Sequence, residues 1–234
     1  MEQFLRSSLI IGENNTKLLQ QKTVLLCGIG GVGSYTLEAL VRMGIGHIIL
    51  VDNDKVSITN LNRQLIALNS TIGQLKVDVA KNRALDINTN LKVDTYPIFI
   101  NDDTIDILFK HHIDYIVDAV DTVNAKINLI KKANELNIPI ISSMGTGNKL
   151  DPTKLHITDI SKTEYCPLAK TMRYELRKIN IKHLKVLTSK EPPIKIEQIK
   201  DENNRIIIGS TSFVPSTARL IIASEVIKDL INSN

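Results

Sequence analysis

Cysteine is scarce in this chain of 234 residues, which contains only Cys27 and Cys166. Neither belongs to a Cys-x-x-Cys pair, so the sequence lacks the ligand spacing of the usual structural zinc site. So low a count also fits a reducing compartment, where structural disulfides are rare. Because Cys27 lies within an apolar run, we expect it to be a small buried core residue.

Long apolar segments and an export signal are missing as well. No apolar run approaches the ~20 residues that a membrane-spanning helix requires. The first residues, from Met1 to Arg6, lack the basic flank and the apolar core of a signal peptide. We therefore expect no membrane span and a cytoplasmic location.

Positive charge is concentrated in one segment. The chain has a formal net charge of +4, whereas eight basic and two acidic residues lie between Lys162 and Lys190. A solvated helix face would explain this cluster, and so would a surface that binds an anionic partner such as nucleic acid. Lys170, Arg173 and Arg177 are spaced by three and four residues, which would place them on one helix face as candidate RNA-binding residues.

Short apolar runs alternate with amphipathic stretches along most of the chain. Strands separated by helices of this length predict right-handed crossovers, and hence an α/β, Rossmann-like, doubly wound and mainly parallel sheet. The predicted strands cover residues 23–27, 47–51, 113–117, 138–141 and 155–158, and the predicted helices cover residues 34–43, 73–88, 125–136, 167–179 and 214–230.

The length of the chain indicates one large domain over residues 1–234. Within it we expect a nucleotide-binding core at residues 1–152. Residues 153–234 would then form a basic elaboration and a C-terminal helix.

A glycine-rich turn follows the first predicted strand. Gly28, Gly30 and Gly33 form a Gly-x-Gly-x-x-Gly pattern that opens a helix, and Asp52 follows the next strand. Such a turn allows close backbone approach, the helix N-terminus offers unpaired N–H groups to phosphate, and the acid suits ribose hydroxyls. The pattern predicts a bound nucleotide, but it fits a nicotinamide dehydrogenase as well as an enzyme that uses ATP.

Charged residues further along the chain favour ATP. Arg63 and Lys76 could meet phosphates, and Asp121, at the C-terminal end of a buried strand, could hold Mg²⁺. Hydride transfer needs no such set, whereas the displacement of pyrophosphate does, because charge builds on the phosphoryl oxygens. Each residue alone has an ordinary explanation, as a surface ion pair, a solvated lysine or a helix N-cap.

This constellation resembles the ubiquitin-activating (MoeB and ThiF) superfamily over residues 6 to about 140. The resemblance implies that the glycine turn and Asp52 hold adenosine and ribose, and that Asp121 binds Mg²⁺. It also implies an arginine near the N-terminus, here Arg6, that reaches the ATP of a partner subunit in a homodimer. The residues expected to bind or activate ATP are Gly28, Gly30, Gly31, Gly33, Asp52, Asp54, Asn60, Arg63, Gln64, Lys76 and Asp121, with Arg6, Arg63 and Lys76 in the catalytic roles.

Further stretches are similar to the bacterial branch that acts on tRNA, the threonylcarbamoyladenosine dehydratases. The resemblance implies a tRNA partner that carries threonylcarbamoyladenosine, whose carboxylate is adenylated by ATP and then cyclised. An adenylyltransferase of a ubiquitin-like sulfur carrier, with such a carrier as its protein partner, stays open as the alternative. The stretches that carry the likeness are residues 28–35, 151–153, 159–163, 167–169 and 212–215.

Arg219 departs from the pattern of that family, and Cys166 is the one cysteine for which a chemical role is considered. Arg219 lies in the first turns of the final predicted helix, where we expect a small residue, usually glycine. Cys166 precedes Pro167 in an expected loop beside the basic helix, where a thioester or sulfur-carrier role is the less favoured interpretation. The cyclisation itself requires no protein nucleophile.

Overall fold

Seven strands form one sheet in the computed structural model, which describes residues 2–197, 199–200, 204 and 206–232. The strand order is β3-β2-β1-β4-β5-β7-β6, and every neighbouring pair is parallel except β6 and β7. The α/β prediction of a mainly parallel sheet is therefore confirmed. The strands are β1 Thr23–Cys27, β2 His47–Val51, β3 Lys92–Tyr96, β4 Tyr115–Asp118, β5 Ile140–Ser143, β6 Leu155–Asp159 and β7 Lys185–Ser189.

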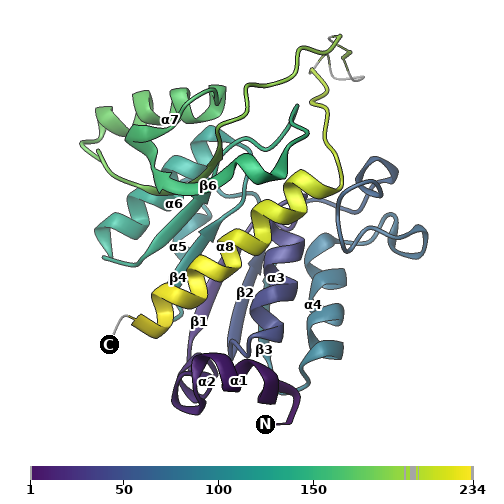
Figure 1. The fold of residues 1–234 in the computed structure, drawn as a ribbon, viewed down its shortest axis with the longest axis vertical. Helices are drawn as coiled ribbons and strands as arrows, with labels where there is room; N and C mark the ends of the chain where they lie inside the picture. Colours follow the sequence, from purple (N-terminus) through teal and green to yellow (C-terminus); the bar gives the residue numbers. More distant parts are fainter. Residues whose placement is uncertain (1, 198, 201–203, 205, 233–234) are drawn as a thin grey trace.

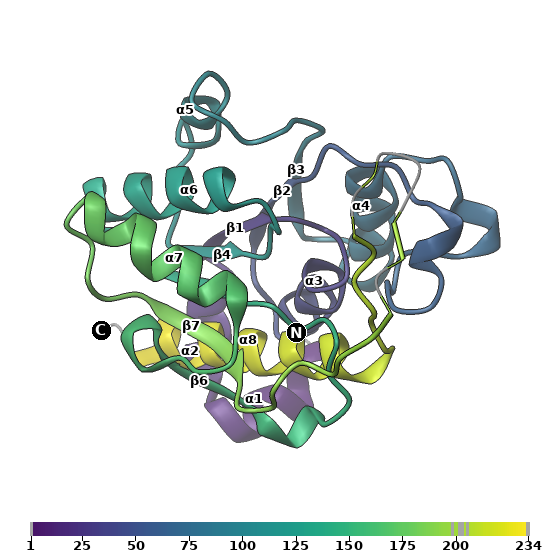
Figure 2. The ribbon, with the colours of Figure 1, turned by 90° about the horizontal axis from the view of Figure 1, so that it is seen from above.

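Helices cover both faces of this sheet (Figures 1 and 2). The helix predicted over residues 73–88 begins at Lys76, because Gly73 has a φ of +85° and cannot continue a helix. The helices are α1 Leu5–Ile11, α2 Glu13–Leu19, α3 Gly33–Arg42, α4 Lys76–Ile87, α5 Ile105–Leu108, α6 Val123–Glu135, α7 Pro167–Lys178 and α8 Phe213–Asn232, and the short 3₁₀ turns are η1 Glu2–Phe4, η2 Ile58–Asn60, η3 Asn69–Thr71, η4 Pro152–Lys154 and η5 Ile160–Lys162.

The central strand β1 is buried on both faces. Val24 and Leu26 pack into the core beneath α3, α4 and α8, whereas Leu25 and Cys27 pack into the core beneath α5 and α6. This alternation follows from the period of two in a strand. Cys27 is fully buried, as expected, and burial raises the pKa of its thiol.

The strand order reverses between β1 and β4. From β1 the chain builds outward to β2 and β3, and it then returns to place β4 on the other side of β1. In open α/β sheets, the crevice outside the carboxyl ends of the strands at such a reversal is where ligands bind. The glycine turn leaves β1 at this point.

Two glycines are required by the backbone at the turn. Gly28 has a φ of +88°, and a Cβ placed on it would lie 2.6 Å from the carbonyl oxygen of Ala119. A Cβ on Gly33 would lie 1.7 Å from the carbonyl oxygen of Gly28. The first turn of α3 therefore packs directly on the end of β1, which no larger residue allows.

The longest helix, α8, packs on the sheet. It lies across one face of the sheet beside α3 (Figure 1), and its own Val214, Ala218 and Ile222 are buried in the core between the helix and the sheet. No helix in residues 2–197 or 206–232 is both long and apolar enough to cross a membrane.

Gly33→Ala is expected to destabilise the fold, because its Cβ would overlap the carbonyl oxygen of Gly28. We expect the free energy of unfolding to fall by at least about 2 kcal/mol and Tm to fall by roughly 5–10 °C in thermal melts. Gly30→Ala is the matched control, because the nearest atom to its Cβ would be 3.7 Å away. Equal Tm values for the two variants would contradict this packing.

Candidate nucleotide site

The candidate site lies where β1, β2 and β4 end. The glycine turn, from Gly28 to Gly33, leads from β1 into the N-terminus of α3. Asp52 follows β2, and residues 119–121 follow β4. Parallel strands bring these segments to one edge of the sheet, so the structure gathers residues that lie almost one hundred positions apart.

Asp52 is bonded to the glycine turn itself. Its Oδ2 accepts a hydrogen bond from the Ile29 N–H at 2.6 Å, and its Oδ1 accepts one from the Asp54 N–H at 2.8 Å. Burial raises the pKa of the Asp52 carboxyl, while the nearby charge of Lys76 lowers it. The carboxylate thus fixes the turn and stands beside it.

Lys76 is not a solvated helix lysine, since only 4% of the residue is exposed. Its Nζ lies 2.6 Å from Oδ2 of Asp54 and 4.0 Å from Oδ1 of Asp52. The side chain of Asp54 is 60% exposed. A buried lysine whose strongest partner faces solvent can exchange that partner for a phosphate at small cost.

Two further predicted residues, Asn60 and Gln64, lie in η2 and just after it. Oδ1 of Asn60 accepts a hydrogen bond from the Ser57 N–H and closes the first turn of η2. Gln64 is 6% exposed, and its Nε2 would be 3.7 Å from a Cβ on Gly30. Within the described part of the chain, Oε1 of Gln64 has no hydrogen-bond partner. A buried acceptor without a donor is costly, so this atom fits a site that a ligand completes.

Arg63 also approaches the turn. Its Nη1 donates to the Thr59 carbonyl oxygen at 2.8 Å and to Oδ1 of Asn62 at 2.9 Å. Its Nε lies 3.7 Å from the position of a Cβ on Gly31. Burial lowers the pKa of this guanidinium. Arg63 is held by neutral acceptors, so its charge is available to an anion at the turn.

Asp121 is exposed and lies between β4 and α6. Among the described residues its carboxylate makes no hydrogen bond or ion pair, and no group of three or more His, Cys, Asp or Glu side chains there could hold a metal ion. A lone carboxylate fits Mg²⁺, which keeps several waters and shares substrate phosphates. The donor set therefore suits a nucleotide-bound ion and not a resident metal.

Below Asp121 is a buried network that the sequence did not reveal. Oδ2 of Asp118 lies 3.0 Å from Nζ of Lys126 and accepts from Oγ of Ser142 at 2.5 Å, and all three residues are fully buried. The other carboxylate oxygen accepts from the Val120 N–H at 3.3 Å. Asp118 therefore anchors the loop that carries Asp121.

Arg6 does not reach the site of its own chain. It is exposed on α1, at the amino ends of the strands, whereas the glycine turn lies at the carboxyl ends (Figure 1). Leu5, Leu9 and Ile10 on the same helix expose 58%, 77% and 86% of their surfaces. Any contact of Arg6 with ATP must therefore be made in another subunit.

The three basic residues of α7 are not equivalent. Lys170 and Arg177 are exposed, but Arg173 is half-buried and its Nη1 donates to the carbonyl oxygen of Thr163 at 3.1 Å. The same nitrogen also contacts Oγ1 of Thr163. Arg173 is thus hydrogen-bonded to the turn before the helix. We therefore expect it to contribute less to RNA binding than its spacing suggested.

Cys166 lies at the N-cap of α7 and is 6% exposed. Its Sγ accepts hydrogen bonds from the N–H groups of Ala169 and Gly145, both at 3.4 Å. It therefore caps a helix and is not a residue of an open loop. A buried sulfur in that position does not favour a thioester role.

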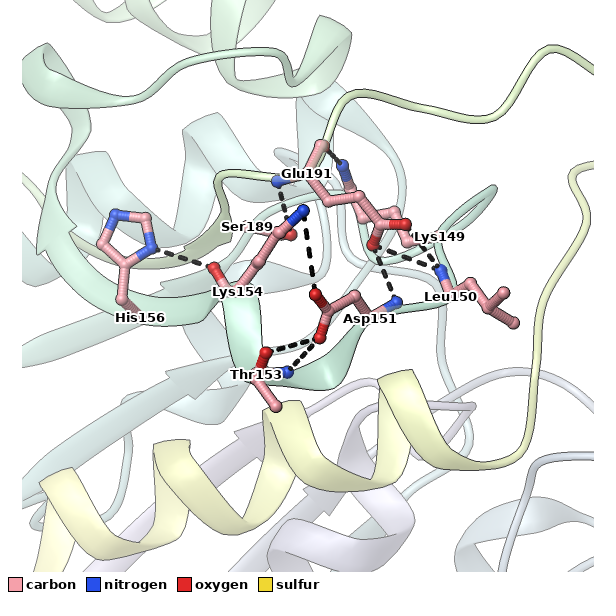
Figure 3. A network of polar contacts seen from close by, with 8 residues as sticks. All are labelled: Lys149, Leu150, Asp151, Thr153, Lys154, His156, Ser189 and Glu191. Carbon is pink, nitrogen blue, oxygen red and sulfur yellow. Dashed lines mark hydrogen bonds and ion pairs between the residues drawn. The ribbon is translucent and has the colours of Figure 1, made fainter.

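The resembling stretch at residues 151–153 is part of a polar network that Figure 3 shows in close-up. Oε1 of Glu191 accepts a hydrogen bond from the Leu150 N–H, and its Oε2 accepts one from the Asp151 N–H, each at 3.0 Å. Lys149 donates from Nζ to the carbonyl oxygen of Glu191. These bonds tie the connection between β5 and β6 to the segment after β7.

Two known proteins are similar to this chain over almost its whole length. The tRNA threonylcarbamoyladenosine dehydratase of Bacillus subtilis (strain 168) is 44% identical, over 99% of this chain and 95% of that protein. The crystal structure of E. coli tRNA N6-threonylcarbamoyladenosine dehydratase, TcdA, in complex with ATP is similar with a TM-score of 0.90 and 29% identity, over 99% of this chain and 95% of that chain.

A less similar relative is named for a different activity. The adenylyltransferase and sulfurtransferase UBA4 of Candida glabrata is 32% identical, over 63% of this chain and 34% of that protein. The ThiF family matches residues 4–233. This chain therefore belongs to the ThiF family, as its glycine turn and strand order indicated.

Proposed function

We propose that this protein is an ATP-dependent tRNA threonylcarbamoyladenosine dehydratase. The observation that carries the proposal is the glycine turn at the reversal of strand order, with Gln64 and Arg63 beside it and Lys76 beside Asp52 and Asp54. The ATP complex of the E. coli relative and the identity to the B. subtilis relative support the same activity.

The first step is adenylation. An oxygen of the threonyl carboxylate attacks the α-phosphorus of ATP, the bond from that phosphorus to the bridging oxygen breaks, and pyrophosphate leaves. Lys76 and Arg63 would bind the phosphoryl oxygens as charge builds on them. Asp121 would hold Mg²⁺, which neutralises part of the charge of the leaving pyrophosphate when bound.

The second step is ring closure. A nitrogen or oxygen of the same side chain attacks the acyl carbon and loses its proton, a five-membered ring forms, and the carbon–oxygen bond to AMP breaks. The reaction is intramolecular, so orientation supplies much of its rate. No protein nucleophile is needed, in agreement with a Cys166 that is buried and caps α7.

The proposed assembly is a homodimer in the cytoplasm. The apolar side chains exposed on α1 support a partner subunit, since exposed apolar groups on one helix favour burial. A substrate carried on tRNA supports the cytoplasmic location. Adenylation of a ubiquitin-like sulfur carrier stays the alternative, and the distant likeness to UBA4 is what favours it.

Mass spectrometry of tRNA nucleosides tests the activity. After incubation with ATP and Mg²⁺, threonylcarbamoyladenosine should be replaced by a nucleoside that has lost one water, with AMP and pyrophosphate formed in equal amounts. An unchanged nucleoside, together with co-purification of a ubiquitin-fold protein and not RNA, would favour the alternative.

Lys76→Ala and Asp121→Ala should each abolish ATP-dependent turnover without unfolding the protein. Loss of one preorganised charge in such a site costs ~10²-fold or more in rate. Pyrophosphate release measures this, with Lys81→Ala and Asp103→Ala as controls for the loss of a charge elsewhere. Near-normal release by Lys76→Ala or Asp121→Ala would remove that residue from the mechanism.

Arg6→Ala and Lys76→Ala are expected to complement each other. If Arg6 acts across the dimer, a mixed dimer contains one site with both residues intact, so mixing two inactive variants should restore part of the turnover. An arginine supplied in trans can contribute several powers of ten in phosphoryl transfer. No recovery under subunit exchange, or a monomer by light scattering, contradicts this arrangement.

Lys170→Glu with Arg177→Glu should weaken tRNA binding and leave ATP binding unchanged. Each lost phosphate contact lowers the slope of log affinity against log salt by about 0.7–0.9. Arg173 is excluded from the pair because it bonds to Thr163. Lys17→Glu with Lys228→Glu is the control, since those side chains are 56% and 63% exposed on other helices. Equal tRNA affinity for both pairs would mean that α7 does not bind RNA.

A further inference from the structure

Arg219, in the second turn of α8, is the largest fully buried side chain among the described residues. A buried arginine ordinarily pairs with a carboxylate. This one makes no ion pair within the described part of the chain, and its Nε and Nη2 have no hydrogen-bond partner there. Its Nη1 donates to the carbonyl oxygen of Arg63 at 3.3 Å, and its Cζ lies 5.3 Å from the centroid of the Tyr35 ring.

The unpaired side of this guanidinium faces the glycine turn. Nη2 of Arg219 lies 2.6 Å from the position that a Cβ would have on Gly31, so the side chain occupies space that only a glycine leaves. Nε of Arg63 lies 3.7 Å from the same position. Two guanidinium groups therefore converge on one backbone position.

Like charges at such a site repel each other. Burial is the main cause that lowers the pKa of Arg219 to about 9; the nearby Tyr35 acts against this shift and the charge of Arg63 acts with it. No carboxylate forms an ion pair with Arg219 among the described residues. Charges in a low-dielectric interior are screened little by salt. An arrangement of this kind is unfavourable in the free protein and becomes favourable when an anion binds at the turn.

We propose that Arg219 determines which nucleotide the site retains: from behind Gly31, its charge favours ATP, with its triphosphate, over AMP. The inference rests on the proposed function, which supplies ATP as the substrate and AMP as the product. No atom of the side chain is exposed, so the guanidinium acts as a charge through the turn and is a specificity-determining residue, not a catalytic one.

The position of Arg219 along the turn indicates which phosphates it favours. Asp52 bonds to Ile29 and thereby marks the ribose side of the turn, and Lys76 stays near Asp52 and Asp54. Arg219 and Arg63 lie two residues further on, at Gly31. The β- and γ-phosphates, which AMP lacks, are therefore the groups that gain most from Arg219.

Three substitutions separate charge from packing. Arg219→Met removes the charge and keeps most of the volume, Arg219→Lys keeps the charge, and Arg219→Gly introduces the small residue that the sequence resemblance favours. Arg83→Met is the matched control, because Arg83 pairs with Glu38 on the outside of α3 and α4. Dissociation constants for ATP and for AMP, together with Tm without nucleotide, are measured for each.

Arg219→Met should weaken ATP binding roughly ten- to a hundredfold, the size expected of one charge several ångströms away in a protein interior. Its AMP affinity should change by no more than about threefold, because AMP lacks the phosphates concerned. Arg219→Lys should keep the preference for ATP and Arg219→Gly should lose it. The Tm of Arg219→Met without nucleotide should equal or exceed that of the unmodified protein, since an uncompensated buried charge is removed.

Two results would overturn the inference. Equal weakening of ATP and AMP in Arg219→Met, with a lower Tm, would give Arg219 a packing role alone. An unchanged ratio of ATP to AMP affinity in a stable Arg219→Met protein would show that its charge does not reach the phosphates. Failure of the proposed function is distinct from both, because it would appear as an unchanged tRNA nucleoside with the unmodified protein, whereas these two results are read from the affinities for ATP and AMP.

Discussion

The contact between the backbones of Gly28 and Gly33 is the constraint on which the nucleotide site depends. It places the N-terminus of α3 directly on the end of β1, with no side chain between them. Asp52 holds the same turn from the neighbouring strand through the Ile29 N–H. The turn is therefore fixed before any ligand binds, and it lies with the N-terminus of α3 at the carboxyl end of β1, where the strand order reverses.

Around that turn the protein gathers polar groups that it does not satisfy by itself. Oε1 of Gln64 and two nitrogens of Arg219 lack partners among the described residues, and Lys76 pairs chiefly with an exposed acid. Such groups lower the stability of the free protein. The cationic groups become favourable when an anionic nucleotide binds, whereas Oε1 of Gln64 is an acceptor and needs a ligand donor such as a hydroxyl or an amino group. A site built in this way gives up stability for affinity. The buried bond between Asp118 and Lys126 supports the loop of Asp121 from below.

Local patterns predicted the parts of the fold that depend on short-range order. The apolar run ending at Cys27, the glycines and the acid after β2 were sufficient for the turn and for a nucleotide, and the alternation of apolar and amphipathic stretches was sufficient for the parallel sheet. The ATP-using family was predicted only with the charged residues further along the chain and the resemblance that they carry. Strands β3 and β7 were missed, since residues 92–96 and 185–189 mix charged and apolar residues and are strands because neighbouring strands pair with them.

Side-chain direction could not be predicted from spacing. Arg173 has the spacing of an exposed helix residue, yet it turns to Thr163, which precedes the helix and is positioned by η5. From the sequence, Arg219 was notable only as a departure from an expected glycine. Its proposed role depends on its contact with Gly31, which lies nearly two hundred residues earlier in the chain. Sequence showed which residues were unusual, and packing showed what they contact.

The claim that ATP is attacked at its α-phosphorus by a carboxylate of the tRNA can be tested with one isotope measurement. The threonyl carboxylate is labelled with oxygen-18, and the nucleotide products of a single turnover are analysed by mass spectrometry. Adenylation followed by ring closure predicts one labelled oxygen in AMP and none in pyrophosphate. Label in inorganic phosphate, with ADP in place of AMP, would mean that the γ-phosphorus is attacked and would contradict the mechanism.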